Sequence, residues 1–219
     1  MSRLILLPGL GADERLCQPQ LNLTGRIEVP NWIAPNRNEP LTSYAKRFAA
    51  HLDTTQPFFL AGISFGGMIA LELAKHLNPT AVCLIASCRS PKGVRPIFRL
   101  AGKSLLWLPP SVIGAGRHVP GAAHWIFGTQ TPEQDNLLNT VLMDMDLTFV
   151  RWGMRALLAW PGVDRLDCPI RHIHGSADRL LPICKVEPDI AVEGAGHLVN
   201  LTHPQIVNEN LKKWMHDLS

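Results

Sequence analysis

The chain has 219 residues, of which 46% are hydrophobic and 18% are charged. This apolar fraction supplies one substantial core and excludes intrinsic disorder, and the 17 Gly and 18 Pro follow no period, which excludes a collagen-like or low-complexity chain. The net charge of +3 does not indicate a nucleic-acid partner, which would need a concentrated basic patch. We therefore expect one globular domain over residues 1–219.

The cysteines and the apolar segments indicate the cellular compartment. The 5 Cys are odd in number, scattered and without a CxxC pair, which argues against a disulfide framework and against a zinc ribbon. The apolar run near the N-terminus meets Pro8-Gly9 too early for a signal peptide, and no apolar stretch reaches the roughly 18 to 20 residues of a membrane span. We expect a cytoplasmic protein without stable membrane insertion.

Short apolar runs alternate with helical patterns over the first 86 residues. The run at 4–7 is wholly apolar, as is typical of a strand that helices bury on both faces. Apolar residues in 41–52 recur at helical spacing, with Thr42 or Ser43 as the expected cap. The elements expected here are strands at 4–7, 26–29, 57–63 and 81–86 and helices at 12–21, 41–52 and 68–77.

The alternation stops after residue 86. Residues 87–165 contain no clear strand, and we interpret them as a helical lid insertion with helices near 96–107, 132–142 and 147–160. Strands are expected again at 169–175 and 190–192, before a last helix at 204–215. Strands and helices that alternate in this way predict an α/β fold with a mostly parallel sheet and helices on both faces.

The segment Gly62-Ile63-Ser64-Phe65-Gly66 lies where an expected buried strand meets an expected helix. A serine in so sharp a turn projects its hydroxyl above the sheet, and the glycines avoid collisions with neighbouring backbone. Ser64 is therefore the candidate nucleophile. The alternative is a Gly-Ser turn that only tightens the connection between strand and helix.

A serine hydroxyl needs a base to remove its proton, and the base needs an acid to orient it. His197 follows the last expected strand in a glycine-rich loop, and Asp178 follows the strand before it. Both positions lie at the sheet edge where open α/β sheets place their sites. The chain order Ser, Asp, His is that of α/β-hydrolases.

With these residues the chain resembles the α/β-hydrolase family, in particular its small bacterial carboxylesterase-like members. Leu7-Pro8-Gly9-Leu10-Gly11 resembles the family's oxyanion loop, with Pro8 in place of the usual His. The resemblance implies that the backbone N–H groups of Leu10 and Phe65 form the oxyanion hole. Since the first expected strand starts near residue 3, we expect the family's two leading strands to be absent from the sheet. The resemblance then implies a three-layer αβα sandwich with a sheet of about six strands.

Other residues are weaker candidates for function. Asp189 and Asp164 are alternatives to Asp178 as the acid. His172 and His174 share one face of a strand, but no third ligand at helpful spacing makes them a metal pair, and we interpret them as core or supporting histidines. In the Gly9-x-Gly11 segment Glu14 occupies the place of a third glycine, which argues against a dinucleotide site. We expect neither a metal nor an organic cofactor.

The expected lid is strongly basic. Its first part, residues 87–132, contains six cations and no Asp or Glu: the cations are Arg89, Lys92, Arg95, Arg99, Lys103 and Arg117. Arg95, Arg99 and Lys103 fall at i, i+4 and i+8 and would form one stripe of a helix. Such a stripe is either a solvated face or a means of attracting an anionic substrate or a negatively charged membrane surface. Large lid side chains are expected to pack the lid onto the core or to line an acyl pocket: Trp107, Trp125, Phe127, Met143, Met145, Trp152 and Trp160.

The sequence thus predicts a serine hydrolase that cleaves ester-type bonds of a small to medium apolar acyl substrate through an acyl-enzyme on Ser64. His197 is the expected base, and Asp178 the residue that orients it. The alternatives are a thioesterase, amidase or acyltransferase, a lyase that uses the same triad, and a non-catalytic ligand-binding protein on the same fold. The oligomeric state stays open.

Overall fold

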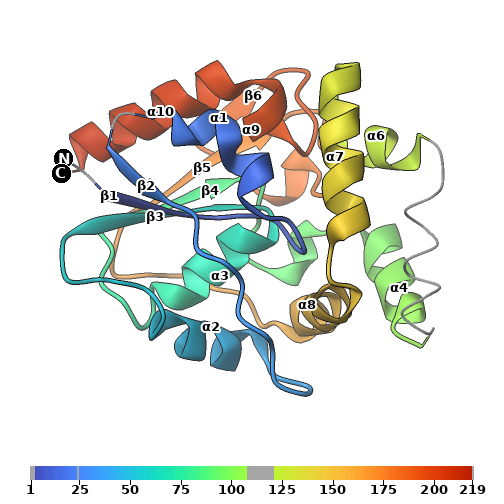
Figure 1. Ribbon diagram of the computed structural model, residues 1–219, viewed down its shortest axis with the longest axis horizontal. Coiled ribbons are helices and arrows are strands. Elements are labelled where there is room, and N and C mark those ends of the chain that lie inside the picture. The colour runs from blue at the N-terminus through green and yellow to red at the C-terminus, as the bar shows by residue number, and fades with distance from the viewer. Residues whose placement is uncertain (1–2, 24, 108–120, 219) are drawn as a thin grey trace.

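Six parallel strands form the centre of the computed structural model, which describes residues 3–23, 25–107 and 121–218 (Figure 1). The order across the sheet is β2-β1-β3-β4-β5-β6, and all five neighbouring pairs are parallel. This confirms the predicted α/β class with a sheet of about six strands. The bounds are β1 Arg3–Leu7, β2 Arg26–Glu28, β3 Phe58–Ile63, β4 Val82–Ile85, β5 Ile170–Gly175 and β6 Ile190–Val192.

Helices bury both faces of this sheet, because successive side chains of a strand point to opposite sides. Leu4 and Leu6 of β1 pack in the cluster that α10 (Pro204–Asp217) covers, whereas Ile5 and Leu7 pack on the side of α2 (Leu41–Ala49) and α3 (Phe65–Leu73). The short helices α1 (Gln18–Leu21) and α9 (Val199–Thr202) lie on the α10 side (Figure 1). The result is the three-layer αβα sandwich that the sequence predicts.

The regular elements described between β4 and β5 are all helices, and the longer ones lie beyond the carboxyl ends of the strands (Figure 1). The helices of this segment are η2 (Pro91–Gly93), α4 (Pro96–Leu105), α6 (Ala122–Phe127), α7 (Pro132–Asp144) and α8 (Leu147–Ala159). Trp152 of α8 fixes the segment to the sandwich, since its ring centroid lies 4.4 Å from that of Tyr44 and its indole N–H donates to the carbonyl of Glu39 at 2.8 Å. Arg117, one of the predicted basic residues, falls outside the described residues.

Several local predictions need correction. The helix expected at 12–21 is split into a 3-10 turn, η1 (Glu14–Cys17), and α1, because Pro19 fits only in the first turn of a helix. The expected cap by Thr42 or Ser43 is wrong: α2 starts at Leu41 after Pro40, so both side chains lie inside the helix. The helix expected from residue 68 already starts at Phe65, directly after the serine turn. A further 3-10 turn, η4 (Ile183–Lys185), separates β5 from β6.

The large side chains of residues 87–165 divide into two groups. Trp152 and Trp160 are buried, and Phe127 and Met145 line a cavity, as expected. The expectation is wrong for Trp107, Trp125 and Met143, which are 90%, 53% and 47% exposed. Trp125 instead lies against the guanidinium of Arg179, whose central carbon is 4.9 Å from the ring centroid. No helix in the described ranges has the length and apolarity to cross a membrane.

Candidate active site

The candidate site lies where the direction of the chain's path across the sheet reverses. From β1 the chain continues to β2 on one side, and β3 then pairs with β1 on the other side. The loops that leave the carboxyl ends of β1 and β3 therefore diverge, and in open α/β sheets this is the place where ligands bind. These two loops carry Leu10 and Ser64.

Ser64 occupies a strained turn between β3 and α3. Its φ of 52° and ψ of −118° lie in a region that residues other than glycine rarely adopt. Such a turn requires the two flanking glycines. A Cβ on Gly62 would lie 2.3 Å from the backbone of Gly66, and a Cβ on Gly66 would lie 2.3 Å from the carbonyl oxygens of Leu7 and Pro8. The local sequence therefore forces the serine hydroxyl out of the sheet edge.

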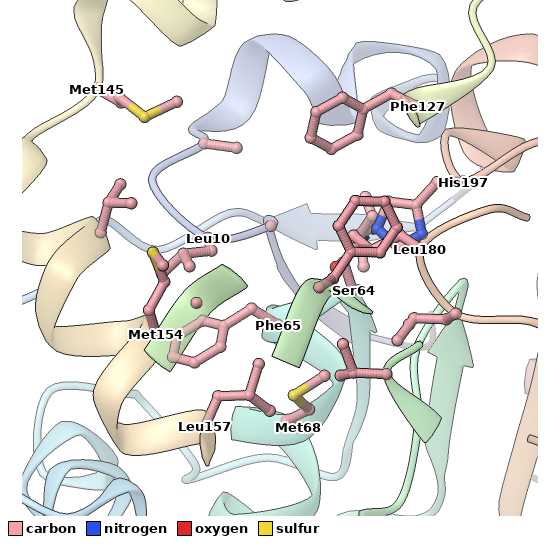
Figure 2. Close-up of a pocket in the computed structure, with 18 of the residues that line it drawn as sticks. Leu10, Ser64, Phe65, Met68, Phe127, Met145, Met154, Leu157, Leu180 and His197 are labelled. Carbon is pink, nitrogen blue, oxygen red and sulfur yellow. Dashed lines mark hydrogen bonds between the residues drawn. The ribbon is translucent and has the colours of Figure 1, made fainter. Parts of the chain in front are cut away.

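The three residues predicted as a triad lie together in one line of hydrogen bonds. The Nε2 of His197 is 2.8 Å from the Oγ of Ser64, and its Nδ1 is 2.7 Å from the Oδ2 of Asp178 (Figure 2 shows the first pair). A carboxylate accepts, so Nδ1 carries the proton, and Nε2 of the neutral ring is left to accept from the serine hydroxyl. His197 and Asp178 are both buried.

Asp178 is held as a carboxylate. Its Oδ1 accepts the backbone N–H groups of Leu180 and Leu181, both at 2.8 Å. Burial by itself would raise the pKa of Asp178, but the charge interaction with His197 and the hydrogen bonds from His174, His197 and Leu181 outweigh it and hold the pKa below its ordinary value. An ionised Asp178 can orient His197 and stabilise the imidazolium form.

Two further histidines stand behind the carboxylate. The Nε2 of His174 is 2.7 Å from the carbonyl oxygen of Leu181 and 3.2 Å from the Oδ2 of Asp178. The Nε2 of His172 lies 3.1 Å from the Nδ1 of His174. Since Nε2 of His174 must donate to that carbonyl, Nδ1 of a neutral ring accepts from His172. His172 thus orients His174, which in turn holds the carboxylate of Asp178 in place.

Leu10 and Phe65, the residues predicted to supply the oxyanion hole, both line the cavity that Ser64 opens into. Phe65 is the first residue of α3, so its N–H precedes the helical hydrogen bonds. Within the described parts of the chain the N–H of Leu10 has no acceptor. Both groups are therefore available to a developing oxyanion.

An apolar cavity of about 350 Å³ opens at Ser64 (Figure 2). Its walls come from the segments that follow β1, β3, β5 and β6 and from the helical segment between β4 and β5. Figure 2 shows among the lining residues Leu10, Phe65, Met68, Phe127, Met145, Met154, Leu157 and Leu180. A volume of this size is ordinary for a small-molecule site, and apolar walls favour a hydrocarbon group.

The weaker candidates lie elsewhere. Asp189 accepts the backbone N–H of His172 at 2.7 Å, its carboxylate lies 3.6 Å from Arg171, and it does not reach the cavity. Asp164 is exposed on the stretch before β5. Over the ranges described, no three His, Cys, Asp or Glu side chains gather as metal ligands.

Sequence reasoning missed the contribution of Ser87. Its hydroxyl donates to the carbonyl oxygen of Ser64 at 2.6 Å and so braces the strained turn from the end of β4. The available signal was its place directly after a buried strand, at the same sheet edge as Ser64. The link from His174 to Asp178 had a weaker signal, the i, i+4 spacing across the end of β5.

Comparisons with known proteins agree with this architecture. A sequence model of the alpha/beta hydrolase family matches residues 4–210, whereas a search of curated proteins finds no significant match. A hydrolase from Oleispira antarctica has a TM-score of 0.79 at 13% identity, over 99% of this chain and 91% of that chain. An esterase from Thermogutta terrifontis has a TM-score of 0.78 at 17% identity, over 100% and 90%. An esterase from Exiguobacterium antarcticum has a TM-score of 0.77 at 17% identity, over 99% and 92%. The family match spans nearly the whole chain, and the chain therefore belongs to the alpha/beta hydrolase family.

Proposed function

We propose that this protein is a serine hydrolase that cleaves ester bonds of small to medium apolar acyl substrates. One observation carries the proposal: the hydrogen-bonded line Asp178–His197–Ser64 ends on a serine hydroxyl at the wall of an apolar cavity. Family membership and two structural neighbours whose names call them esterases support it.

The contacts of the three residues support the following order of proton transfers. His197 Nε2 takes the proton of Ser64 while Oγ bonds to the ester carbonyl carbon, whose oxygen becomes an oxyanion held by the N–H groups of Leu10 and Phe65. The C–O bond to the alcohol then breaks, and His197 returns the proton to the leaving oxygen. Water repeats both steps on the acyl-enzyme and releases the acid.

Asp178 contributes by orientation and charge. Its Oδ2 fixes the proton of His197 on Nδ1, and its negative charge stabilises the imidazolium that exists while the proton is in transit. The two backbone donors and His174 keep the carboxylate ionised and fixed in place. No step requires a metal or an organic cofactor.

Residues 87–165 act in this proposal as a lid within one domain that spans the whole chain. The described helices of the segment supply a large part of the cavity wall, with Phe98 and Gly102 from α4 and Met154 and Leu157 from α8. Their apolar side chains favour a hydrocarbon acyl group and limit the access of water to the acyl-enzyme.

A series of p-nitrophenyl esters of increasing acyl length tests the proposal. We expect kcat/KM to rise by up to about fourfold per added methylene, the equivalent of about 0.8 kcal/mol, until the cavity is filled. Ser64→Ala removes the nucleophile and leaves the cavity intact, so it serves as the matched control. Hydrolysis that survives in Ser64→Ala contradicts the serine mechanism. Binding of the acyl chain without turnover in the unmodified protein would favour a ligand-binding role instead.

A further inference from the structure

The cavity at Ser64 contains one charged side chain that the mechanism does not use. Besides Ser64 and His197, the only polar side chain among its described lining residues is that of Arg99. Arg99 lies in α4, one turn before Gly102, where the helix packs against Met154 and Leu158 of α8. The cations of α4 therefore do not form one solvated stripe, because Arg99 lies at the cavity wall whereas Lys103 is exposed.

The guanidinium of Arg99 has no partner in the described structure. Its Nε is buried without a hydrogen-bond acceptor, and its side chain forms no ion pair with any described residue. Other arginines near the cavity find acceptors: Arg151 donates to the carbonyl of Leu106 and Arg179 to that of Trp125. A buried donor without an acceptor is unfavourable, so its position beside the cavity indicates an acceptor that arrives with a ligand.

The surrounding sequence cannot neutralise this charge. Residues 87–132 contain no Asp or Glu, and Arg95, one turn earlier, adds a second positive charge at the start of α4. The apolar walls near Arg99 also keep the local dielectric low, which strengthens its attraction for an anion. The cavity wall thus carries a guanidinium in addition to the hydroxyl of Ser64 and the imidazole of His197.

We propose that Arg99 selects ester substrates that carry an anionic group, a carboxylate or a phosphate, in addition to the apolar acyl chain. The planar guanidinium presents Nε and Nη to two oxygens of such a group at once, and this contact satisfies the buried Nε. The inference rests on the proposed hydrolase function and adds the substrate class. The anionic group can belong to the acyl part or to the alcohol part, because both parts of the ester occupy the site while Ser64 attacks the carbonyl carbon.

Two matched pairs of esters test the inference and separate these sources. The first pair is the p-nitrophenyl ester of hexanoate and the p-nitrophenyl half-ester of adipate, which bears a carboxylate at the end of the acyl chain. The second pair is 4-(hexanoyloxy)benzoate and its methyl ester, which differ by a carboxylate on the alcohol part. For each pair the readout is the ratio of kcat/KM for the charged ester to kcat/KM for the neutral ester.

We expect Arg99→Gln to lower this ratio roughly 10- to 100-fold in one of the two pairs, as for a lost hydrogen bond to a charged group. Arg99→Lys keeps the charge but not the Nε donor, and it should lower the ratio less than Arg99→Gln does. Lys103→Gln, the control one turn further along α4, should leave it within about twofold, because the Lys103 side chain is exposed and screened.

Two results would overturn the inference: an unchanged ratio in Arg99→Gln for both pairs, or an equal fall in Lys103→Gln, which would reduce the effect to general attraction by the basic segment. If Arg99→Gln does not fold, the ratio of kcat/KM values is compared between Arg99→Lys and the unmodified protein. An unchanged ratio for both pairs then overturns the inference. Failure of the underlying function is seen separately, since the neutral esters would then not be hydrolysed through Ser64 at all.

Discussion

His172, the buried histidine next to His174 and close to the carboxylate of Asp178, should make folding stability fall as the solution becomes acidic. Burial, and after it the electrostatic interaction with His174, lower the pKa of His172 from 6.5 to about 3. As the pH falls below 6.5, the unfolded chain binds a proton on this residue that the folded protein does not. Stability due to neutral His172 is therefore complete above pH 6.5 and is lost progressively between pH 6.5 and about 3.

The size of this loss follows from the two pKa values. Each pH unit inside that window is equivalent to about 1.4 kcal/mol, so the free energy of unfolding should fall by about 2 kcal/mol between pH 7.5 and pH 5 through His172 alone. Urea denaturation followed by tryptophan fluorescence at both pH values measures the fall. His172→Gln keeps a side-chain donor for His174. In this variant the free energy of unfolding should differ between the two pH values by about 2 kcal/mol less than in the unmodified protein.

The matched control is His51→Gln, which removes an exposed histidine at the end of α2 and should leave the pH difference nearly unchanged. Comparing the two pH differences cancels the contributions of the other titrating groups and any general loss of stability in one variant. If His172→Gln retains the full fall in stability between pH 7.5 and pH 5, the burial of neutral His172 is not its cause.

Three further substitutions test the site. Asp178→Asn should lower kcat for ester hydrolysis by about four orders of magnitude through the wrong tautomer of His197, and a loss below tenfold would contradict its role. Gly66→Ala places a Cβ 2.3 Å from two carbonyl oxygens, so urea denaturation should show a loss of a few kcal/mol together with lost activity. His174→Leu removes a donor to Asp178 and should lower kcat about tenfold and shift the acidic limb of the pH–rate profile, whereas an unchanged profile would assign it a packing role only.

The sheet and the serine turn were predictable because their physical causes are local. A buried parallel strand needs a continuous apolar run, and residues 58–63 and 82–85 supply such runs in all positions. The turn at Ser64 needs glycines at 62 and 66, where any Cβ would meet backbone atoms. The parallel topology then determines that loops after β3, β5 and β6 share one edge, and this places Asp178 and His197 near Ser64.

The helical segment was less predictable because its side-chain directions depend on tertiary packing. The spacing of Arg95, Arg99 and Lys103 describes a stripe, but the sequence does not show which side of α4 meets α8. Packing of Gly102 against Leu158 turns Arg99 to the cavity, while Trp107 lies past the end of the helix and remains exposed. For the same reason the contact between His174 and Asp178 depends on how the chain turns after β5.

Labelling with a fluorophosphonate, followed by peptide mapping, tests the central claim most directly. The reagent needs an activated serine hydroxyl and does not depend on knowing the substrate. We expect one covalent adduct on Ser64 in the unmodified protein and a much slower reaction in His197→Ala, where no base accepts the proton. Absence of an adduct on Ser64, or an adduct formed equally fast in His197→Ala, would contradict the proposed mechanism.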